Sequence, residues 1–210
     1  DRLAERYCAV SRRALTEQGA ELAAISDCPA DRVALVLART EGLGARQALR
    51  EVLMTYAPGH AVAESMDWYG QVGGVFSAGT LEHYPPFALE AEVARMALAL
   101  RPGGVMSHVV DHRDHRWHAD KRLCPLAHLT LDDDAYARRF ATPLDYHNRW
   151  LMHRYVDLFT RYGFHVTVRT AIAYPPDLPP LDRSRLAPPF RDATEEELGS
   201  LVTHFVAVKR

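Results

Sequence analysis

The sequence predicts an α/β fold of three layers built on a mostly parallel sheet. Short apolar runs bounded by turn residues alternate with stretches of helical spacing, and two strand-like runs lie close together near the C-terminus. With 210 residues, of which 48% are hydrophobic, the chain has the material for one buried core. We therefore expect a single domain over residues 1–210.

The first elements alternate between helix and strand. Residues 3–14 carry apolar side chains at helical spacing, and Gly19 follows where a helix would end. The apolar run 21–27 closes with an acidic residue and is typical of a buried parallel strand. Next we expect helices over 31–39 and 45–54 and a strand near 60–64.

The later elements are marked more sharply. A strand is expected at Val72–Ala78, and Pro85 and Pro86 open a helix whose apolar residues repeat from Leu89 to Leu100. The polar, His-rich stretch 111–128 has neither strand nor helix periodicity and predicts a functional loop. The remaining expected elements are strands at 105–110, 164–170 and 202–208, a helix near 146–162, and a helix with a capping box from Thr194 to Glu197.

Composition argues against several functional classes. The net charge is −2, and the basic residues are spread along the chain. We therefore expect neither a nucleic-acid surface nor a polybasic membrane patch. No apolar run approaches the ~18 residues of a membrane span. The cysteines Cys8, Cys28 and Cys124 form no closely spaced pair, which favours a reducing, cytoplasmic location.

Two motifs resemble a known family. The segment Val75–Tyr84 contains Ser77 and Leu81-Glu82-His83, and it is followed by a helix and by Arg101-Pro102-Gly103-Gly104. In this order they resemble class I (Rossmann-like) S-adenosylmethionine-dependent methyltransferases, where such segments end the fourth strand and lead into the fifth. The resemblance implies a Rossmann-like fold and S-adenosylmethionine as cofactor.

Further motifs are similar to one subgroup of that family, with a DxxDH loop after the fifth strand. They are Asp111–His115, Asn148-Arg149-Trp150 and Tyr162-Gly163-Phe164. The resemblance runs from about residue 21 to 210. The family's first strand and glycine-rich cofactor turn should come before the first helix, so we expect this domain to be incomplete at its N-terminal end.

The resemblance implies a cofactor site at the carboxyl edge of the sheet. Asp27, at the end of its strand, would accept hydrogen bonds from the ribose hydroxyls. The alternative role for Asp27 is a cap for the following helix. Ser77 and Glu82 at the end of the fourth strand, and Asp67 after the third, are the other cofactor-binding candidates.

The catalytic candidates are histidines and aspartates after the fourth and fifth strands. An imidazole–carboxylate pair can take the proton of a hydroxyl or amine nucleophile. The candidates are His83, Asp111, His112, Asp114 and His115, with His108 and His118 nearby. The same residue types could instead bind a metal or simply cap a loop.

Asn148 and Arg149 are candidates for substrate binding, because an arginine fork can hold a carboxylate. We thus expect methyl transfer to an oxygen or nitrogen of a small molecule, without a metal, and leave homo-oligomerisation open. A metal-assisted hydrolase or lyase using the 111–118 loop and a degenerate, non-catalytic module remain the alternatives.

Overall fold

The computed structural model describes residues 30–44, 47–48, 68–139 and 146–210, together with positions 9, 13, 16 and 17. The chain divides into two compact units, Asp1–His60 and Ala61–Arg210, each of which is described by itself. The expected single domain over 1–210 stays a prediction. So do the elements expected over 3–14, 21–27 and 60–64, which lie wholly or largely outside the described residues.

In the first unit, helix α2 (Ala30–Thr40) confirms the helix expected over 31–39. Its last residue, Thr40, closes the helix by donating its hydroxyl hydrogen to the carbonyl oxygen of Val36 at 2.8 Å. The cofactor candidates Asp27 and Asp67 lie outside the described residues.

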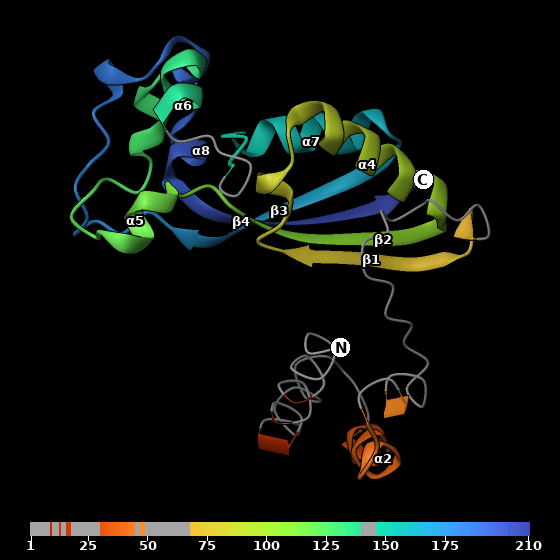
Figure 1. The fold of residues 1–210 in the computed structure, drawn as a ribbon. Coiled ribbons are helices and arrows are strands. Elements are labelled where there is room, and N and C mark those ends of the chain that lie inside the picture. The colour runs from red at the N-terminus through yellow and green to blue at the C-terminus, as the bar shows by residue number, and fades with distance from the viewer. Residues whose placement is uncertain are drawn as a thin grey trace. The chain divides into compact units, whose positions relative to one another are not determined.

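The second unit is built on a four-stranded sheet (Figure 1). Its strands are β1 (Val72–Ala78), β2 (Leu100–Asp111), β3 (Phe164–Ala173) and β4 (Ser200–Lys209), in the spatial order β1-β2-β4-β3. Strand β1 is parallel to β2, whereas β4 is antiparallel to both β2 and β3. The α/β class is confirmed, but the sheet is mixed: β1, β2 and β3 run in one direction and β4 in the other.

The reversed direction of β4 has a local cause. The backbone N–H of Tyr174, just after β3, donates to the carbonyl oxygen of Gly199, just before β4, at 2.8 Å. The intervening residues 175–198 therefore begin and finish at the same end of the sheet, where β3 ends and β4 starts. A strand that starts at the end of the sheet where the previous strand finished must run antiparallel to it, because no crossover carries the chain to the opposite end.

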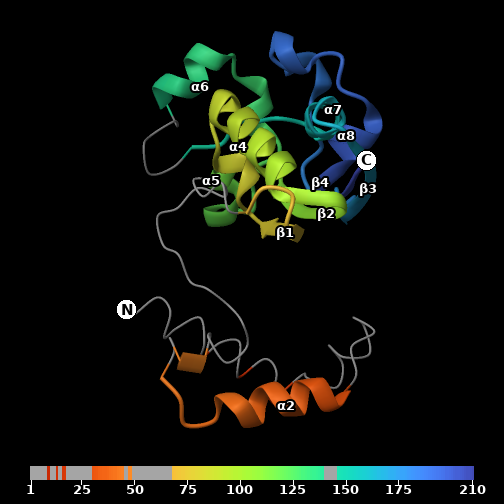
Figure 2. The same ribbon diagram turned by 90° about the vertical axis from the view of Figure 1, so that its right-hand side faces the viewer.

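Helices α4 (Pro86–Ala99) and α7 (Met152–Arg161) cover one face of this sheet (Figures 1 and 2). The prolines place the start of α4 as expected, with Pro86 in its first turn. The core between helices and strands is apolar and fully buried, and includes Leu89, Val93, Met106, Tyr155, Phe159 and Phe205. A third layer is not among the elements described in the second unit and stays a prediction.

Short helices gather beyond the carboxyl end of β2 (Figure 1). They are α5 (His115–Ala119), η3 (Ala127–Thr130), α6 (Asp133–Arg139), η4 (Arg183–Arg185), η5 (Pro188–Phe190) and α8 (Glu195–Gly199). A second apolar cluster, with Leu126, Leu129, Leu186, Phe190 and Leu198, joins η3, η5 and α8. The stretch 111–128, expected to be irregular, thus contains α5 and part of η3. No described helix is both long and apolar enough to cross a membrane.

Candidate functional site

The candidate site lies where β1 and β2 end. Because the two strands are parallel, the segments that follow them meet at one edge of the sheet. After β1 comes the 3-10 helix η2 (Leu81–His83), and after β2 comes the loop leading to α5. Ligands of open α/β sheets collect at this kind of edge.

Five histidine side chains meet there, which we call the imidazole cluster: His83, His115, His118, His128 and His147. Ring centroids are 5.1 Å apart for His83 and His115, 5.2 Å for His115 and His147, and 5.2 Å for His128 and His147. His118 lies 6.5 Å from His115. The sequence did not single out His147 or His128 as site residues, since their closeness depends on how separate loops fold.

The buried members of the cluster are uncharged. Burial, together with neighbouring cationic groups, lowers the pKa of His147 to about 3 and that of His128 well below its ordinary value. His147 donates from Nε2 to the carbonyl oxygen of Asp111 and accepts at Nδ1 from the backbone N–H of Arg149. With both ring nitrogens engaged, His147 positions its neighbours and has no free nitrogen for a ligand.

His83 is the member best placed to take a proton. Its side chain is exposed, and Nδ1 lies 2.9 Å from the carbonyl oxygen of Tyr146. Because a carbonyl can only accept, Nδ1 of the neutral ring carries the hydrogen, and Nε2 presents its lone pair. His83 therefore combines accessibility, a fixed tautomer and a basic nitrogen.

Asp111 is held as a carboxylate by its own loop. Burial would raise its pKa, but hydrogen bonds and the charge of Arg113 outweigh burial and lower it. Arg113 donates from Nε at 2.7 Å and from Nη2 at 2.5 Å. The nearest imidazole nitrogen to this carboxylate is Nε2 of His118, at 3.6 Å. The expected Asp–His pair thus involves His118, which is half exposed.

Asp114 has the local capping role that was the alternative to catalysis. Its side chain accepts from the backbone N–H of Arg116 at 3.0 Å, as the N-cap of α5, and from Nε of the same arginine at 2.9 Å. Asp114 is 4% exposed. Its carboxylate is therefore used within the loop.

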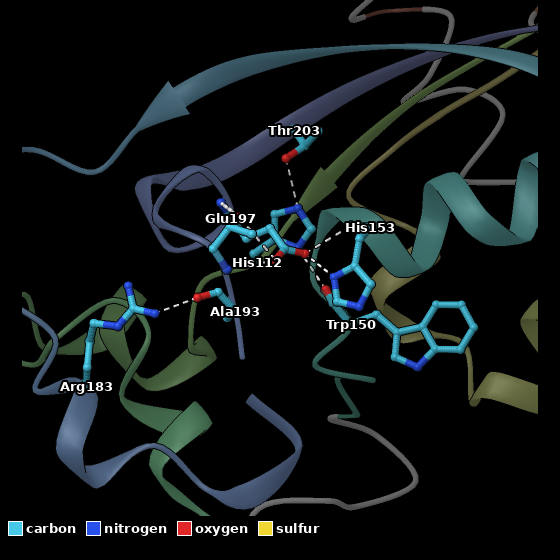
Figure 3. Close-up of polar contacts among 8 residues, drawn as sticks. His112, Trp150, His153, Arg183, Ala193, Glu197 and Thr203 are labelled. Carbon is cyan, nitrogen blue, oxygen red and sulfur yellow. Dashed lines mark hydrogen bonds and ion pairs between the residues drawn. The ribbon is translucent and has the colours of Figure 1, made fainter. Parts of the chain in front are cut away.

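His112 is a buried structural histidine, contrary to the expectation that it could act as the base. Nδ1 donates to the carbonyl oxygen of Trp150 at 3.0 Å, and Nε2 accepts from the hydroxyl of Thr203 at 3.0 Å (Figure 3). Burial lowers its pKa to about 4. The residue ties the loop after β2 to β4 and to the segment before α7. Spacing along the loop could not show that this side chain points inward.

Glu82 and Ser77, the described cofactor candidates, contact the end of β2. Glu82 is buried, and its Oε1 accepts from the backbone N–H of Asp111 at 3.2 Å. Among the described residues, its Oε2 has no hydrogen-bond partner, and burial raises the pKa of this carboxyl. Ser77 Oγ lies 2.8 Å from Nδ1 of His108. Within the described part of this edge, the unsatisfied Oε2 is the buried carboxylate oxygen that a ligand could satisfy.

Asn148 holds the segment before α7 against η2. Its amide nitrogen donates to the carbonyl oxygens of Leu81 and Tyr84, at 3.0 and 3.1 Å. Its oxygen accepts from the backbone N–H of Trp150 and the hydroxyl of Tyr155. Every polar atom of this side chain is engaged, so the geometry favours positioning over substrate contact.

Arg149 is likewise committed to the protein interior, contrary to the expectation of a substrate clamp. It is 4% exposed, and its Nη1 donates to the carbonyl oxygens of His128 and Leu131, at 3.1 and 2.7 Å. Nη2 pairs with Asp133, and the guanidinium lies 4.3 Å from the ring centre of Tyr136. A backbone φ of 59° turns the side chain into this position.

A pocket of about 800 Å³ adjoins the imidazole cluster. Its wall includes Tyr146 and His147, both tied to the cluster, and the pair His153 and Glu197. The sequence identified Glu197 only as part of a capping box and did not single out His153. Their pairing joins α7 to α8 across 44 residues of sequence, so no local pattern could indicate it.

Glu197 stabilises the starts of two helices. Its Oε1 accepts from the backbone N–H of His153 in the first turn of α7, at 3.2 Å, and pairs with the His153 ring (Figure 3). Its Oε2 accepts from the backbone N–H of Thr194 at 3.0 Å, completing the expected capping box of α8. One buried carboxylate therefore satisfies N–H groups at two helix ends.

Replacing this carboxylate should be costly. We expect Glu197→Ala to lower the free energy of unfolding by about 2–3 kcal/mol, because two helix ends lose their acceptor in a buried setting. Glu196→Gln, an exposed change in the same helix, should shift it by less than about 0.5 kcal/mol. Urea unfolding followed by tryptophan fluorescence measures both; equal stabilities for the two variants would contradict the double-capping role.

Among the residues that the structure describes, no three His, Cys, Asp or Glu side chains are arranged to hold a metal ion. This is consistent with the ring contacts of the imidazole cluster, which form a branched chain centred on His115 and His147 instead of converging on one point.

Comparisons with known proteins give likenesses in structure only. No family model and no curated protein matches the chain. A proposed S-adenosylmethionine-dependent methyltransferase from Listeria monocytogenes matches with a TM-score of 0.45 and 18% identity, over 78% of this chain and 74% of the other.

Two further likenesses are of the same kind. A SAM-dependent methyltransferase from Archaeoglobus fulgidus has a TM-score of 0.44 and 11% identity, over 74% of this chain and 68% of the other. A SAM-dependent methyltransferase from Methanosarcina mazei has a TM-score of 0.43 and 16% identity, over 85% of this chain and 76% of the other. All three TM-scores lie below 0.5, and the function of the chain is therefore inferred from its own residues.

Proposed function

We propose that this chain transfers a methyl group from S-adenosylmethionine to an oxygen or nitrogen of a small molecule. The observation that carries the proposal is His83, an accessible imidazole of fixed tautomer in the Leu81-Glu82-His83 motif at the carboxyl end of β1. This motif and the segment Arg101–Gly104 are the residues that resemble the methyltransferase family. The motif follows β1 and the segment lies at the start of β2, and the carboxyl ends of these two strands form the sheet edge where ligands of open α/β folds bind.

The described part of the edge fits the cofactor. Gly79, directly after β1, has a φ of 60°, and an added Cβ there would lie 3.7 Å from Oε1 of Glu82. Backbone and carboxylate thus form a compact polar corner with one unsatisfied oxygen, Glu82 Oε2. In the proposed function Ser77 and Glu82 hold the cofactor at this edge, and Asp27 and Asp67 remain cofactor-binding candidates from the sequence alone. When bound, S-adenosylmethionine supplies an electrophilic methyl group on a positively charged sulfur.

The protein's part in the reaction is positioning and proton transfer. Nε2 of His83 would receive the proton of the acceptor hydroxyl or amine, so that the acceptor oxygen or nitrogen can take the methyl group as its bond to the cofactor sulfur breaks. The backbone carbonyl of Tyr146 stabilises the imidazolium that results, because it accepts from Nδ1. Asn148 donates to the carbonyl oxygens of Leu81 and Tyr84, and so fixes η2 and the backbone of His83.

Calorimetry with S-adenosylhomocysteine on the complete polypeptide tests cofactor binding. We expect saturable binding that weakens in Asp27→Ala. If well-folded protein did not bind S-adenosylhomocysteine, the proposal of methyl transfer would be wrong, and the alternative of a degenerate, non-catalytic module would remain.

Turnover separates the base from the cofactor residues. His83→Gln should lower methyl transfer by about 100-fold or more with little effect on S-adenosylhomocysteine affinity. His165→Gln, an exposed change at the opposite end of the sheet on β3, is the matched control. Methyl transfer lost on chelation, together with one equivalent of bound metal, would instead contradict proton transfer by an imidazole without a metal.

A further inference from the structure

The pocket beside the imidazole cluster has the size and wall of a small-molecule site. Its volume of about 800 Å³ lies within the range of ligand pockets, about 300–1,000 Å³. Four aromatic residues line it: Tyr136, Tyr146, Trp150 and Phe190. Aromatic faces suit a flat ligand, and the polar residues that share the wall, among them Asp133, Arg154 and Asp192, suit one that also carries polar groups.

The polar group that stands out in this wall is His153. It lies in the first turn of α7, and its side chain is 53% exposed. Its Nδ1 pairs with Oε1 of Glu197, which is 5% exposed (Figure 3). Because the carboxylate accepts, Nδ1 of the neutral ring carries the hydrogen and Nε2 bears the lone pair. Within the described part of the chain, no hydrogen bond engages that Nε2.

A purely structural role does not account for this imidazole. Glu197 caps α7 through the backbone N–H of residue 153, which every residue type except proline provides. The capping box of α8 uses only Glu197 and Thr194. The ring of His153 is therefore an addition to the capping arrangement, and what it adds is an oriented acceptor at the pocket wall.

Two residues of the pocket wall also contact the imidazole cluster. The backbone carbonyl of Tyr146, which lines the pocket, accepts from Nδ1 of His83, and the ring of His147, which also lines it, lies edge-on to that of His115 with centroids 5.2 Å apart. One part of the pocket wall is thus built by the segment that orients His83.

We infer that this pocket binds the methyl acceptor, that the acceptor is a flat molecule of phenol type, and that Nε2 of His153 accepts a hydrogen bond from a hydroxyl other than the group that is methylated. The use of the ligand as acceptor rests on the proposed function, whereas its recognition by His153 does not. His153 is a binding residue in this scheme, and Glu197 positions it.

Two matched probes test the recognition without any cofactor: p-cresol, and 4-methylanisole, in which the hydroxyl hydrogen is replaced by a methyl group. Their affinities for the full chain can be measured by ligand-detected NMR titration. We expect p-cresol to bind about tenfold more tightly, the value of one hydrogen bond to an oriented acceptor. In His153→Phe, which keeps a ring but removes the acceptor, the two affinities should become equal.

His165→Phe is the control, since it removes an exposed histidine of β3 and should leave the tenfold ratio unchanged. Nitrogen NMR of the His153 ring gives an independent readout: hydrogen on Nδ1 is expected, and hydrogen on Nε2 would overturn the assignment. Equal affinities in the parent protein, no binding of either probe, or an unchanged ratio in His153→Phe would also overturn it.

The outcome separates the two proposals. S-adenosylhomocysteine binding without p-cresol binding would remove the pocket assignment and leave methyl transfer in place. Hydroxyl-selective p-cresol binding without S-adenosylhomocysteine binding would do the reverse. Urea unfolding of each variant shows whether a lost affinity reflects lost structure.

Discussion

Lowering the pH from about 7 to about 5 should cost the second unit several kcal/mol of stability, because four of its histidines are buried and uncharged. They are His108, His112, His128 and His147. Burial lowers the pKa of His108 and His112 to about 4 and that of His147 to about 3, from an ordinary value of 6.5. Burial likewise lowers the pKa of His128 well below that value.

The direction follows from proton uptake. Between the folded and the ordinary pKa, the unfolded chain binds protons at these rings and the folded chain does not, so acid favours unfolding. The stabilisation is fully present above about pH 6.5 and is lost as the pH falls towards 4. At pH 5, one such histidine lowers the free energy of unfolding by about 2 kcal/mol relative to neutral pH, and the four histidines contribute in the same direction.

Urea titrations at several pH values measure this effect. Trp68, Trp117 and Trp150 all belong to the second unit, so their fluorescence reports on its unfolding. Asp111 and Glu197 also have lowered pKa values, but carboxylates act below about pH 4.5, outside this window. The exposed His165→Gln variant should keep the full pH dependence, and a constant stability from pH 7 to pH 5 would contradict the neutral buried state.

Arg149→Ala should be the most destabilising single change at the site, with a loss of about 3 kcal/mol. It leaves the carbonyl oxygens of His128 and Leu131 without their donor, at a side chain that is 4% exposed. It also removes the guanidinium from the faces of Tyr136 and Phe190. The pair with Asp133 contributes little to this sum, because that carboxylate is 81% exposed.

The same mechanism predicts a graded series. Arg149→Lys keeps the positive charge but lacks the planar guanidinium that reaches two carbonyls and an aspartate. Its free energy of unfolding should therefore lie between those of the parent protein and Arg149→Ala. Arg169→Ala, on the exposed face of β3, should change the stability by less than about 0.5 kcal/mol. If Arg149→Ala retained full stability but lost affinity for an anionic substrate, the expectation of a substrate clamp would return.

The elements that the sequence predicts well are those whose signals are local. The prolines before α4, the apolar repeat from Leu89 onward and the capping box at Thr194 each depend on neighbours within a few residues. The helix expected near 146–162 begins only at Met152, because residues 146–150 form no helix and are held by side-chain bonds of Asn148 and His147. Such bonds cannot be deduced from periodicity.

The sequence predicted which segments would meet, whereas the functional roles of their residues remain predictions. The motif around His83 and the Asp–His loop do meet at one sheet edge, because both follow parallel strands. Which histidine faces solvent is decided by the turn geometry of each loop: His83 is exposed, whereas His112 is 2% exposed. The positive φ of Arg149 likewise turns inward a side chain that its type alone would assign to the surface.

The place of β4 in the sheet has a consequence for how the chain acquires its structure during synthesis. Val105 of β2 pairs with Val208, and Phe164 of β3 pairs with Lys209, so the last of these strands to be made joins two strands made much earlier. Until residues 200–209 leave the ribosome, β3 has no partner in the described sheet and the edge of β2 is open. Sheet formation therefore waits for the synthesis of β4, and a nascent or truncated chain exposes strand edges that favour aggregation.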